Sequence, residues 1–326
     1  MADLFGLLNA TSDSANISVL LSQLPKAKWL NKYDLYQWEG LWYFPAHIES
    51  TLAFQTTFEA RDDDVIIASS PKAGTTWLKA LVSSILNEWN NNSDELDPLT
   101  KENPHNIVMS LEGLIYLLNL KPDLSGIPSP RIFHTHLPYH VLPESIKKSK
   151  CKIVYIARNP KDTFVSLWHF MNTLKPEDQD LYPIDQAFED FCKGIHFFGP
   201  YNDHVLAYWN ESLKCPKKVH FLKYEDLKKD PKEQVKKLGE FLEKPFVNDE
   251  EVDQVLWRCS IERLQNLEVN VSGSFPFGLR HSSFFRLGVV GDWKNCFTKE
   301  MSDRLDHIAR SKFEGSGLNL DIESIE

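Results

Sequence analysis

The sequence has few features of a secreted, membrane-spanning or metal-binding protein. Its cysteines are odd in number and form no C-x-x-C pair; they are Cys151, Cys192, Cys215, Cys259 and Cys296. This usage fits free thiols in a reducing compartment better than a disulfide framework or a zinc site. The first residues, MADLFGLLNATSDS, lack the basic start and long apolar core of a secretory signal. No apolar run is long enough for a transmembrane helix. We therefore expect a cytoplasmic protein that does not enter a membrane.

The chain also lacks an excess of positive charge. It has 36 Lys and Arg against 46 Asp and Glu, a formal net charge of −10. Such a chain is a poor candidate for a general nucleic-acid binder, although a local cationic pocket can still bind a small anion. No Gly/Ser-rich linker or composition break divides the 326 residues. We expect one domain over residues 21–318, a weakly ordered or marginally helical tail over 1–20, and a C-terminal tail over 319–326.

One stretch, DVIIASSPKAGTTWLKALV at residues 64–82, dominates the sequence. Residues 65–68 are apolar and mostly β-branched, as in a buried parallel strand. Gly74 allows close backbone approach, and Thr75 and Thr76 suit the start of a helix. A strand, a tight turn and a helix N-terminus direct free N–H groups and the helix dipole at one point. With the charge of Lys72 nearby, the stretch predicts an anion site.

This stretch is not a Walker A motif, in which the lysine follows the second glycine of G-x-x-x-x-G-K-[ST]. Here Lys72 precedes Gly74, and Thr75 follows it. A magnesium-dependent phosphoryl-transfer enzyme would need the Walker A motif, so this alternative is disfavoured. The other alternative is an ordinary strand–turn–helix whose lysine faces solvent, because short motifs also occur by chance.

A second basic turn follows a second strand pattern, KIVYIA at residues 152–157. Arg158 comes directly after it, Pro160 fits the first turn of a helix, and Ser166 lies on that helix. Alone, Arg158 would be read as a surface salt bridge. Together with the first turn, it indicates a ligand with two separated phosphate-like groups. A third strand is expected at residues 219–222, before Tyr224.

Histidines cluster at the end of another short strand, RIFHTHL at residues 131–137. His134 and His136 share one face of a strand. With His140 they suggest a metal site, but no cysteine or carboxylate stands nearby at ligand spacing. A structural histidine is the plain alternative. The functional alternative is a general base, because histidine titrates near neutral pH.

Taken together, these motifs resemble those of the cytosolic sulfotransferases, which use 3′-phosphoadenosine 5′-phosphosulfate (PAPS) as sulfuryl donor. PKAGTTW resembles the family's 5′-phosphosulfate-binding loop, which implies donor contacts from Lys72, Ala73, Gly74, Thr75, Thr76 and Trp77. ARNPKDTFVSLWHF resembles its 3′-phosphate site, which implies Arg158 and Ser166. THLP resembles its catalytic segment. The resemblance thus implies that His136 takes the acceptor's proton and that Lys72 stabilises charge on the leaving oxygen.

Three further segments carry the resemblance. YEDL implies that Tyr224 contacts the adenine, and Ser260 falls where the family has a serine near the nucleotide. RLGVVGDWK resembles the family's last signature and implies Arg286, Leu287 and Gly288 at the 3′-phosphate. Leu287 stands where a lysine is usual, which removes one positive charge from this site. His134 stands where many animal members have a lysine.

The resemblance implies a single-domain, mostly parallel α/β sheet flanked by helices and related to nucleotide kinases. It implies PAPS as co-substrate, adenosine 3′,5′-bisphosphate (PAP) as product, and no metal. The aromatic segment 29–47, with YQWEGLWY typical of the plant branch, and an expected helix over 107–118 would wall an acceptor site. A second expected helix covers residues 48–60. The aromatic surface favours a flat, apolar hydroxyl compound.

Several points stay open from the sequence. The acceptor classes include phenols, flavonoids, steroid-like alcohols and desulfoglucosinolates. The family's dimer motif keeps Thr298 but has Lys299 for Val and Asp303 for Glu, so we expect a monomer or a weak homodimer. Leu287 and His134 also leave room for a nucleotide-binding protein without catalysis.

Overall fold

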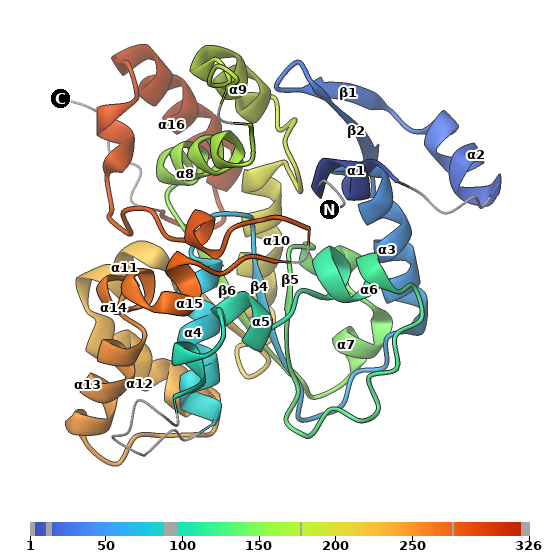
Figure 1. Ribbon diagram of the computed structural model, residues 1–326. Coiled ribbons are helices and arrows are strands. Elements are labelled where there is room, and N and C mark those ends of the chain that lie inside the picture. Colours follow the sequence, from blue (N-terminus) through green and yellow to red (C-terminus); the bar gives the residue numbers. More distant parts are fainter. Residues whose placement is uncertain (1–3, 11–14, 88–96, 177, 276, 321–326) are drawn as a thin grey trace.

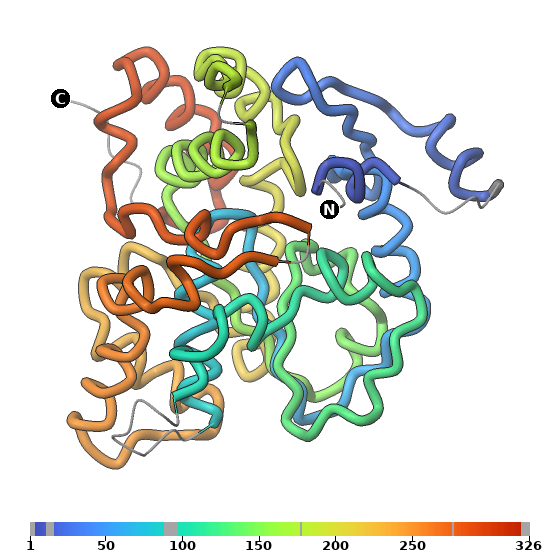
Figure 2. The backbone as a smooth tube through the Cα atoms, viewed as in Figure 1, coloured from blue at the N-terminus to red at the C-terminus, as the bar shows by residue number. Residues whose placement is uncertain are grey.

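The computed structural model describes residues 4–10, 15–87, 97–176, 178–275 and 277–320, whose course is shown in Figures 1 and 2. The central strands are β4 (Val65–Ser69), β5 (Ile132–Thr135), β6 (Lys152–Ala157) and β7 (Val219–Lys223). The longer helices are α2 (Ala15–Gln23), α3 (Pro45–Thr57), α4 (Thr75–Leu86), α8 (Pro160–Thr173), α9 (Ile184–Cys192), α10 (Tyr201–Lys214), α12 (Pro231–Phe241), α13 (Asp249–Arg258) and α16 (Lys299–Phe313). The short ones are α1 (Leu4–Asn9), α5 (Pro104–Ile107), α6 (Tyr116–Leu118), α7 (Glu144–Lys148), α11 (Tyr224–Lys229), α14 (Ile261–Asn266) and α15 (Glu268–Val271).

The central sheet is parallel throughout, in the order β5-β4-β6-β7. Alternate side chains of β6 enter two separate cores: Ile153 and Tyr155 one, Val154 and Ile156 the other. Helices α3, α8 and α10 contribute to the first core, and α4, α12 and α13 to the second. Strands covered on both faces are expected to be apolar without alternation, as the two inner strands β4 and β6 are here. The predicted α/β class is confirmed.

The strands predicted at 65–68, 152–157 and 219–222 are confirmed as β4, β6 and β7. The strand expected at 131–137 is shorter, because β5 ends at Thr135. Helix α4 begins at Thr75, directly after Gly74, as predicted. Helix α8 begins at Pro160, and the side chain of Asn159 accepts a hydrogen bond from the Lys161 backbone N–H at 2.9 Å. Proline and a capping asparagine are typical of this position.

The aromatic segment forms an antiparallel sheet that was not predicted. It consists of β1 (Lys26–Trp29), β2 (Tyr33–Trp38) and β3 (Leu41–Tyr43), in that order. Strands β2 and β3 are joined by Glu39 and Gly40, both with positive φ, as in a tight hairpin turn. In Figure 1 the β1–β2 hairpin lies at the periphery, apart from the central strands.

Two expected helices differ from the structure. The helix expected over 48–60 begins at Pro45 and ends at Thr57. The helix expected over 107–118 is wrong as one element: α5 ends at Ile107, a π-helical turn spans Leu111–Ile115, and α6 follows. The break arises because Ser110 forms a parallel bridge with His134 at the edge of the sheet, which requires extended backbone.

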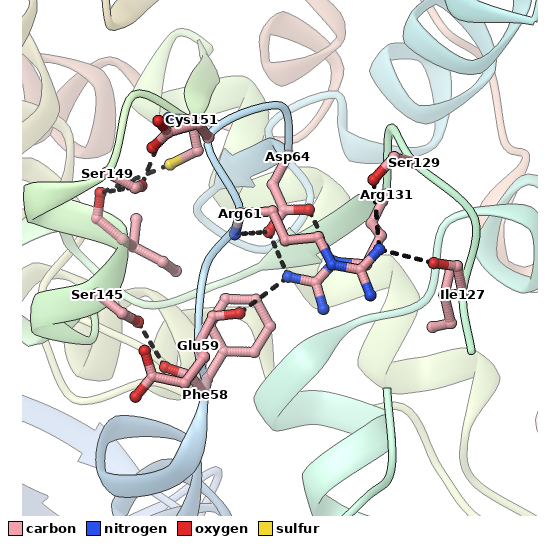
Figure 3. A network of polar contacts seen from close by, with 12 residues as sticks. Phe58, Glu59, Arg61, Asp64, Ile127, Ser129, Arg131, Ser145, Ser149 and Cys151 are labelled. Carbon is pink, nitrogen blue, oxygen red and sulfur yellow. Dashed lines mark hydrogen bonds and ion pairs between the residues drawn. The ribbon is translucent and has the colours of Figure 1, made fainter. Parts of the chain in front are cut away.

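A buried ion pair joins the amino ends of the central strands (Figure 3). Asp64 precedes β4 and Arg131 precedes β5; their side chains are 0% and 4% exposed. The Arg131 Nε and Nη2 donate to the two carboxylate oxygens of Asp64 at 2.8 and 2.5 Å. The Asp64 backbone oxygen accepts from Lys152 N–H at 3.0 Å. One acidic residue therefore ties together the starts of three neighbouring strands.

The ends of the described chain pack on the domain. Leu8 of α1 is buried, and the Phe5 ring stacks on Tyr33 with centroids 4.3 Å apart. The domain boundary expected after residue 20 falls inside α2. Leu320 is buried, whereas the rest of the expected C-terminal tail, residues 321–326, lies outside the described residues. Among the described helices, none has the length and apolarity needed to cross a bilayer.

Candidate active site

A cavity of about 640 Å³ opens where β4, β5 and β6 end. Ligands commonly bind at the carboxyl ends of strands in open α/β sheets. The structure brings together nearly all the residues predicted for the site, and those lining the cavity are Lys72, Gly74, Thr75, Thr76, Trp77, His136, Arg158, Ser166, Tyr224, Ser260, Arg286, Leu287 and Gly288. Ala73 is fully buried and does not line it.

The turn after β4 is shaped to hold an anion. Gly74 has φ +114°, a conformation open mainly to glycine. A Cβ there would lie 2.9 Å from Tyr224 Cδ2 and 3.0 Å from Ile156 Cδ1. Lys72 also has a positive φ of 66°. The hydroxyls of Ser69 and Thr75 are 2.7 Å apart. The free N–H groups of the α4 N-terminus therefore face the cavity together with a lysine and hydroxyls.

The Lys72 side chain is surrounded by aromatic rings and lies near two other cationic side chains. Its ammonium lies over the Phe170 ring at 4.1 Å from the centroid and near Phe284 at 5.5 Å. Burial, followed by repulsion from Arg158 and Arg286, lowers the pKa of Lys72 to about 7. An anionic ligand in the cavity would relieve the repulsion that Lys72 experiences from the two arginines.

The turn after β6 forms the second cationic surface. Arg158 is 6% exposed, and its guanidinium lies 4.6 Å from the centroid of the Tyr224 ring. Its Nη2 donates to the Val289 backbone oxygen at 2.7 Å. The buried Nε finds no hydrogen-bond acceptor in the part of the chain the structure describes. A buried donor without a partner is costly, and a phosphate oxygen would satisfy it.

The segment that follows α15 crosses the middle of the molecule in Figure 2. It packs against the turn after β6 through hydrogen bonds to Arg158 and Asp162. Asp162 of α8 holds it by accepting from the backbone N–H of Gly291 at 2.7 Å and of Trp293 at 3.0 Å. Arg286 forms an ion pair with Asp292 at 2.6 Å. Leu287 is 51% exposed. Gly288 has φ +62°, and a Cβ there would lie 2.3 Å from Ile261 Cδ1.

His136 lies just beyond β5 and faces the cavity. Its Nδ1 lies 2.8 Å from the Ser69 backbone oxygen. A carbonyl only accepts, so Nδ1 carries the proton and donates it, and Nε2 keeps a lone pair. Burial lowers the pKa of His136 to about 3, so the ring is neutral at neutral pH. This is the tautomer a general base needs.

Glu112, which sequence reasoning missed, holds the segment around His136. It is fully buried on the π-helical turn. Its Oε1 accepts from the His136 backbone N–H at 2.7 Å, and its Oε2 accepts from Thr135 Oγ1 at 2.7 Å. Burial raises the pKa of Glu112, and these hydrogen bonds oppose the rise. The His136 backbone oxygen accepts from His204 Nε2 at 2.8 Å. The segment is therefore fixed by long-range contacts.

The histidines considered as metal ligands do not converge. The rings of His134 and His136 are 4.3 Å apart, but His136 Nδ1 is committed to Ser69. His140 is exposed, with Nε2 3.2 Å from the Glu39 backbone oxygen. Over the described residues, no three His, Cys, Asp or Glu side chains gather as a metal-binding group.

The geometry defines a class: an α/β protein with two cationic strand–loop–helix turns on one cavity, suited to an anionic ligand, and a neutral histidine beside one of them. Comparison with known proteins agrees. The family described as "Sulfotransferase domain" matches residues 62–317. The chain is 45% identical to cytosolic sulfotransferase 12 of Arabidopsis thaliana over 92% of both chains, and 42% identical to cytosolic sulfotransferase 6 of that species over 95% of this chain and 97% of the relative.

Solved structures show the same relationship. An Arabidopsis thaliana protein provisionally described as a steroid sulphotransferase aligns with a TM-score of 0.76 at 39% identity, over 95% of this chain and 98% of that one. A mouse sulfotransferase complexed with PAP aligns with a TM-score of 0.68 at 31% identity, over 86% and 95%. The chain therefore belongs to the sulfotransferase family. This confirms the expected class, a PAPS-dependent sulfotransferase of the cytosolic, plant type.

Proposed function

We propose that this protein transfers the sulfuryl group of PAPS to a hydroxyl of a small, largely apolar acceptor, with His136 as general base. The main observation behind this proposal is that two cationic turns, after β4 and after β6, line one cavity that His136 also faces. The unpartnered Nε of Arg158 fits a phosphate of the donor. Gly74 and Gly288 let the backbone of the two loops pack closely against Tyr224 and Ile261, where a Cβ would clash.

The donor binds across both turns. Its 5′-phosphosulfate meets the loop of residues 72–77, in which Ala73 contributes backbone rather than side chain. Its 3′-phosphate meets Arg158, Ser166, Arg286 and the Gly288 backbone. Tyr224, held between Trp77 and Arg158, packs on the adenine, and Ser260 lies near the nucleotide. Leu287 borders the 3′-phosphate without adding a charge.

The transfer is in-line. The acceptor O–H gives its proton to the lone pair on His136 Nε2 as its oxygen bonds to sulfur. The bond from sulfur to the bridging oxygen breaks, its electron pair stays on the 5′-phosphate, and PAP leaves. Lys72 stabilises the growing charge on that bridging oxygen, because a fixed cation in a partly dry site acts most strongly where charge develops. A sulfuryl group carries less charge than a phosphoryl group, so we expect transfer without added metal.

The acceptor binds among apolar side chains beyond His136. The cavity walls there include Phe44, Leu114, Leu117, Phe197 and Phe198. This surface favours a flat, hydrophobic phenol, flavonoid or steroid-like alcohol, and leaves a desulfoglucosinolate as an outcome of the assay. Helix α1 adds Leu4, Phe5 and Leu8 to the wall. We expect a cytoplasmic monomer or weak homodimer that binds neither nucleic acid nor membrane.

A transfer assay tests this function. The purified protein is incubated with PAPS and a panel of these acceptors, and products that gain one sulfuryl group are detected by mass spectrometry. H136A should lose transfer by at least about 100-fold while still binding PAP. H140A is the matched control, because His140 is exposed. Equal rates for H136A and the wild-type protein would remove His136 as the base. Binding of PAP without transfer to any acceptor would favour a non-catalytic nucleotide-binding protein.

A further inference from the structure

A buried lysine on α4 lies in the cavity wall without an acidic partner. Lys79 is 1% exposed and lines the cavity one turn after the N-terminus of α4. No carboxylate in the described part of the chain forms an ion pair with it. Burial lowers the pKa of Lys79 to about 7, and the nearby Glu112 opposes this fall. Burying an ammonium is costly unless an opposite charge compensates it. An anion in the cavity would provide that charge.

Lys79 is connected to the first anion-binding turn through one imidazole. Its Nζ lies 3.0 Å from His105 Nδ1, and His105 Nε2 lies 2.9 Å from Thr76 Oγ1. Two contacts fix the position of His105, one through its backbone and one through its ring. Its backbone N–H donates to the Asn103 side chain at 2.9 Å, and its ring packs on Phe284 with centroids 4.0 Å apart.

When Lys79 is protonated, its charge sets the direction of both hydrogen bonds that link it through His105 to Thr76. An ammonium only donates, so His105 Nδ1 accepts and the ring proton sits on Nε2. Nε2 then donates to Thr76 Oγ1, and the hydroxyl hydrogen of Thr76 is free to donate into the cavity. The reverse order would place an N–H against the ammonium. Burial, with repulsion from Lys79 and Lys72, lowers the pKa of His105 well below its usual value and keeps its ring neutral.

We propose that Lys79 and His105 are positioning residues that act through Thr76: they keep its hydroxyl hydrogen directed at the 5′-phosphate end of the donor. This inference rests on the proposed function. It assigns to Lys79 a role in donor binding that does not require direct contact with the donor.

A double-mutant cycle tests this inference with PAP, which needs no knowledge of the acceptor. Calorimetry measures the Kd of PAP for the wild-type protein, K79M, T76V and the double variant. K79M keeps the length of the side chain and removes its charge. We expect K79M to weaken PAP binding about ten-fold in the wild-type background, and by less than about three-fold in the T76V background. Equal losses in both backgrounds would overturn the inference.

A second pair of variants keeps the test valid if K79M does not fold. The amide of H105Q can accept from Lys79 and donate to Thr76, whereas H105L can do neither. We expect H105Q to retain wild-type affinity within about three-fold and H105L to lose about ten-fold. Equal affinity for the two variants would overturn the inference. K121M is the control for removing a lysine, because Lys121 is exposed.

The cycle also separates this inference from the function on which it rests. No PAP binding by the folded wild-type protein would remove the proposed function itself. PAP binding that is the same in the wild-type protein, K79M and H105L would remove only the role of Lys79 and His105.

Discussion

Replacing Leu287 by lysine should tighten donor binding. Leu287 borders the cavity beside Gly288 and Arg286, where the resemblance to the family implies a lysine. The side chain is 51% exposed, so the substitution removes little from the core. We expect L287K to fold as the wild-type protein does and to add one positive charge at the 3′-phosphate.

The size of the gain follows from the exposure of the site. A hydrogen bond to a charged group contributes roughly 1.5–3 kcal/mol when it is well shielded. A half-exposed ammonium is screened by water and salt, so the lower end applies, and about 1–1.5 kcal/mol corresponds to roughly a five- to ten-fold lower Kd. The gain should shrink as salt is added, because the Debye length falls to about 3 Å at 1 M.

Calorimetric titration with PAP measures this gain. The matched control is L287M, which changes shape without adding charge and should bind as the wild-type protein does. The contrasting variant L287E should weaken binding. If L287K bound PAP no more tightly than L287M at low salt, the 3′-phosphate would not lie near residue 287. The account of the second cationic turn would then be wrong.

Three further predictions concern the turn after β4 and the base. G74A should lower the unfolding free energy by about 2–4 kcal/mol, measured as a lower Tm, because its Cβ would lie 2.9 Å from Tyr224. Gly40 also has a positive φ but no atom within 4 Å of an added Cβ, so G40A should lower the unfolding free energy clearly less. Equal losses for the two variants would refute the steric reason. PAP binding at about pH 8 should take up protons, because the pKa of Lys72 is lowered to about 7 in the empty site and the bound anion raises it. The affinity for PAP should therefore fall as the pH rises above 7. Calorimetry in buffers of different ionisation enthalpy measures the proton uptake, and finding none would contradict this prediction. The kcat/KM for PAPS should show no acid limb near pH 6.5, because the pKa of His136 is lowered to about 3, whereas a midpoint near 6.5 would refute this.

Much of the fold could be predicted because the local signals are strong. An apolar, β-branched run followed by a glycine or proline turn located β4 and β6, and the parallel sheet follows from strands alternating with helices. The β1–β3 sheet was missed because its dense aromatics hide the alternation of a strand. The Glu39–Gly40 pair at its tight turn was the available signal.

The site was only partly predictable for a different reason. The anion-binding turns are local, so their residues could be identified from consecutive letters. Glu112 reaches His136 across 24 residues, and His105 reaches Lys79 across 26. These contacts depend on how distant segments pack, and neither residue stands in a motif. A buried lysine in the middle of an apolar helix pattern was the one signal for Lys79.

The most direct test of the account compares two nucleotides on the wild-type protein. Calorimetry measures the Kd of PAP and of adenosine 5′-monophosphate, which lacks the 3′-phosphate, without added metal. Two cationic turns that share one ligand predict micromolar PAP binding and binding of the monophosphate at least about 100-fold weaker, since two or more charge-assisted hydrogen bonds are lost. Similar affinities for the two, or no PAP binding by the folded protein, would contradict the account.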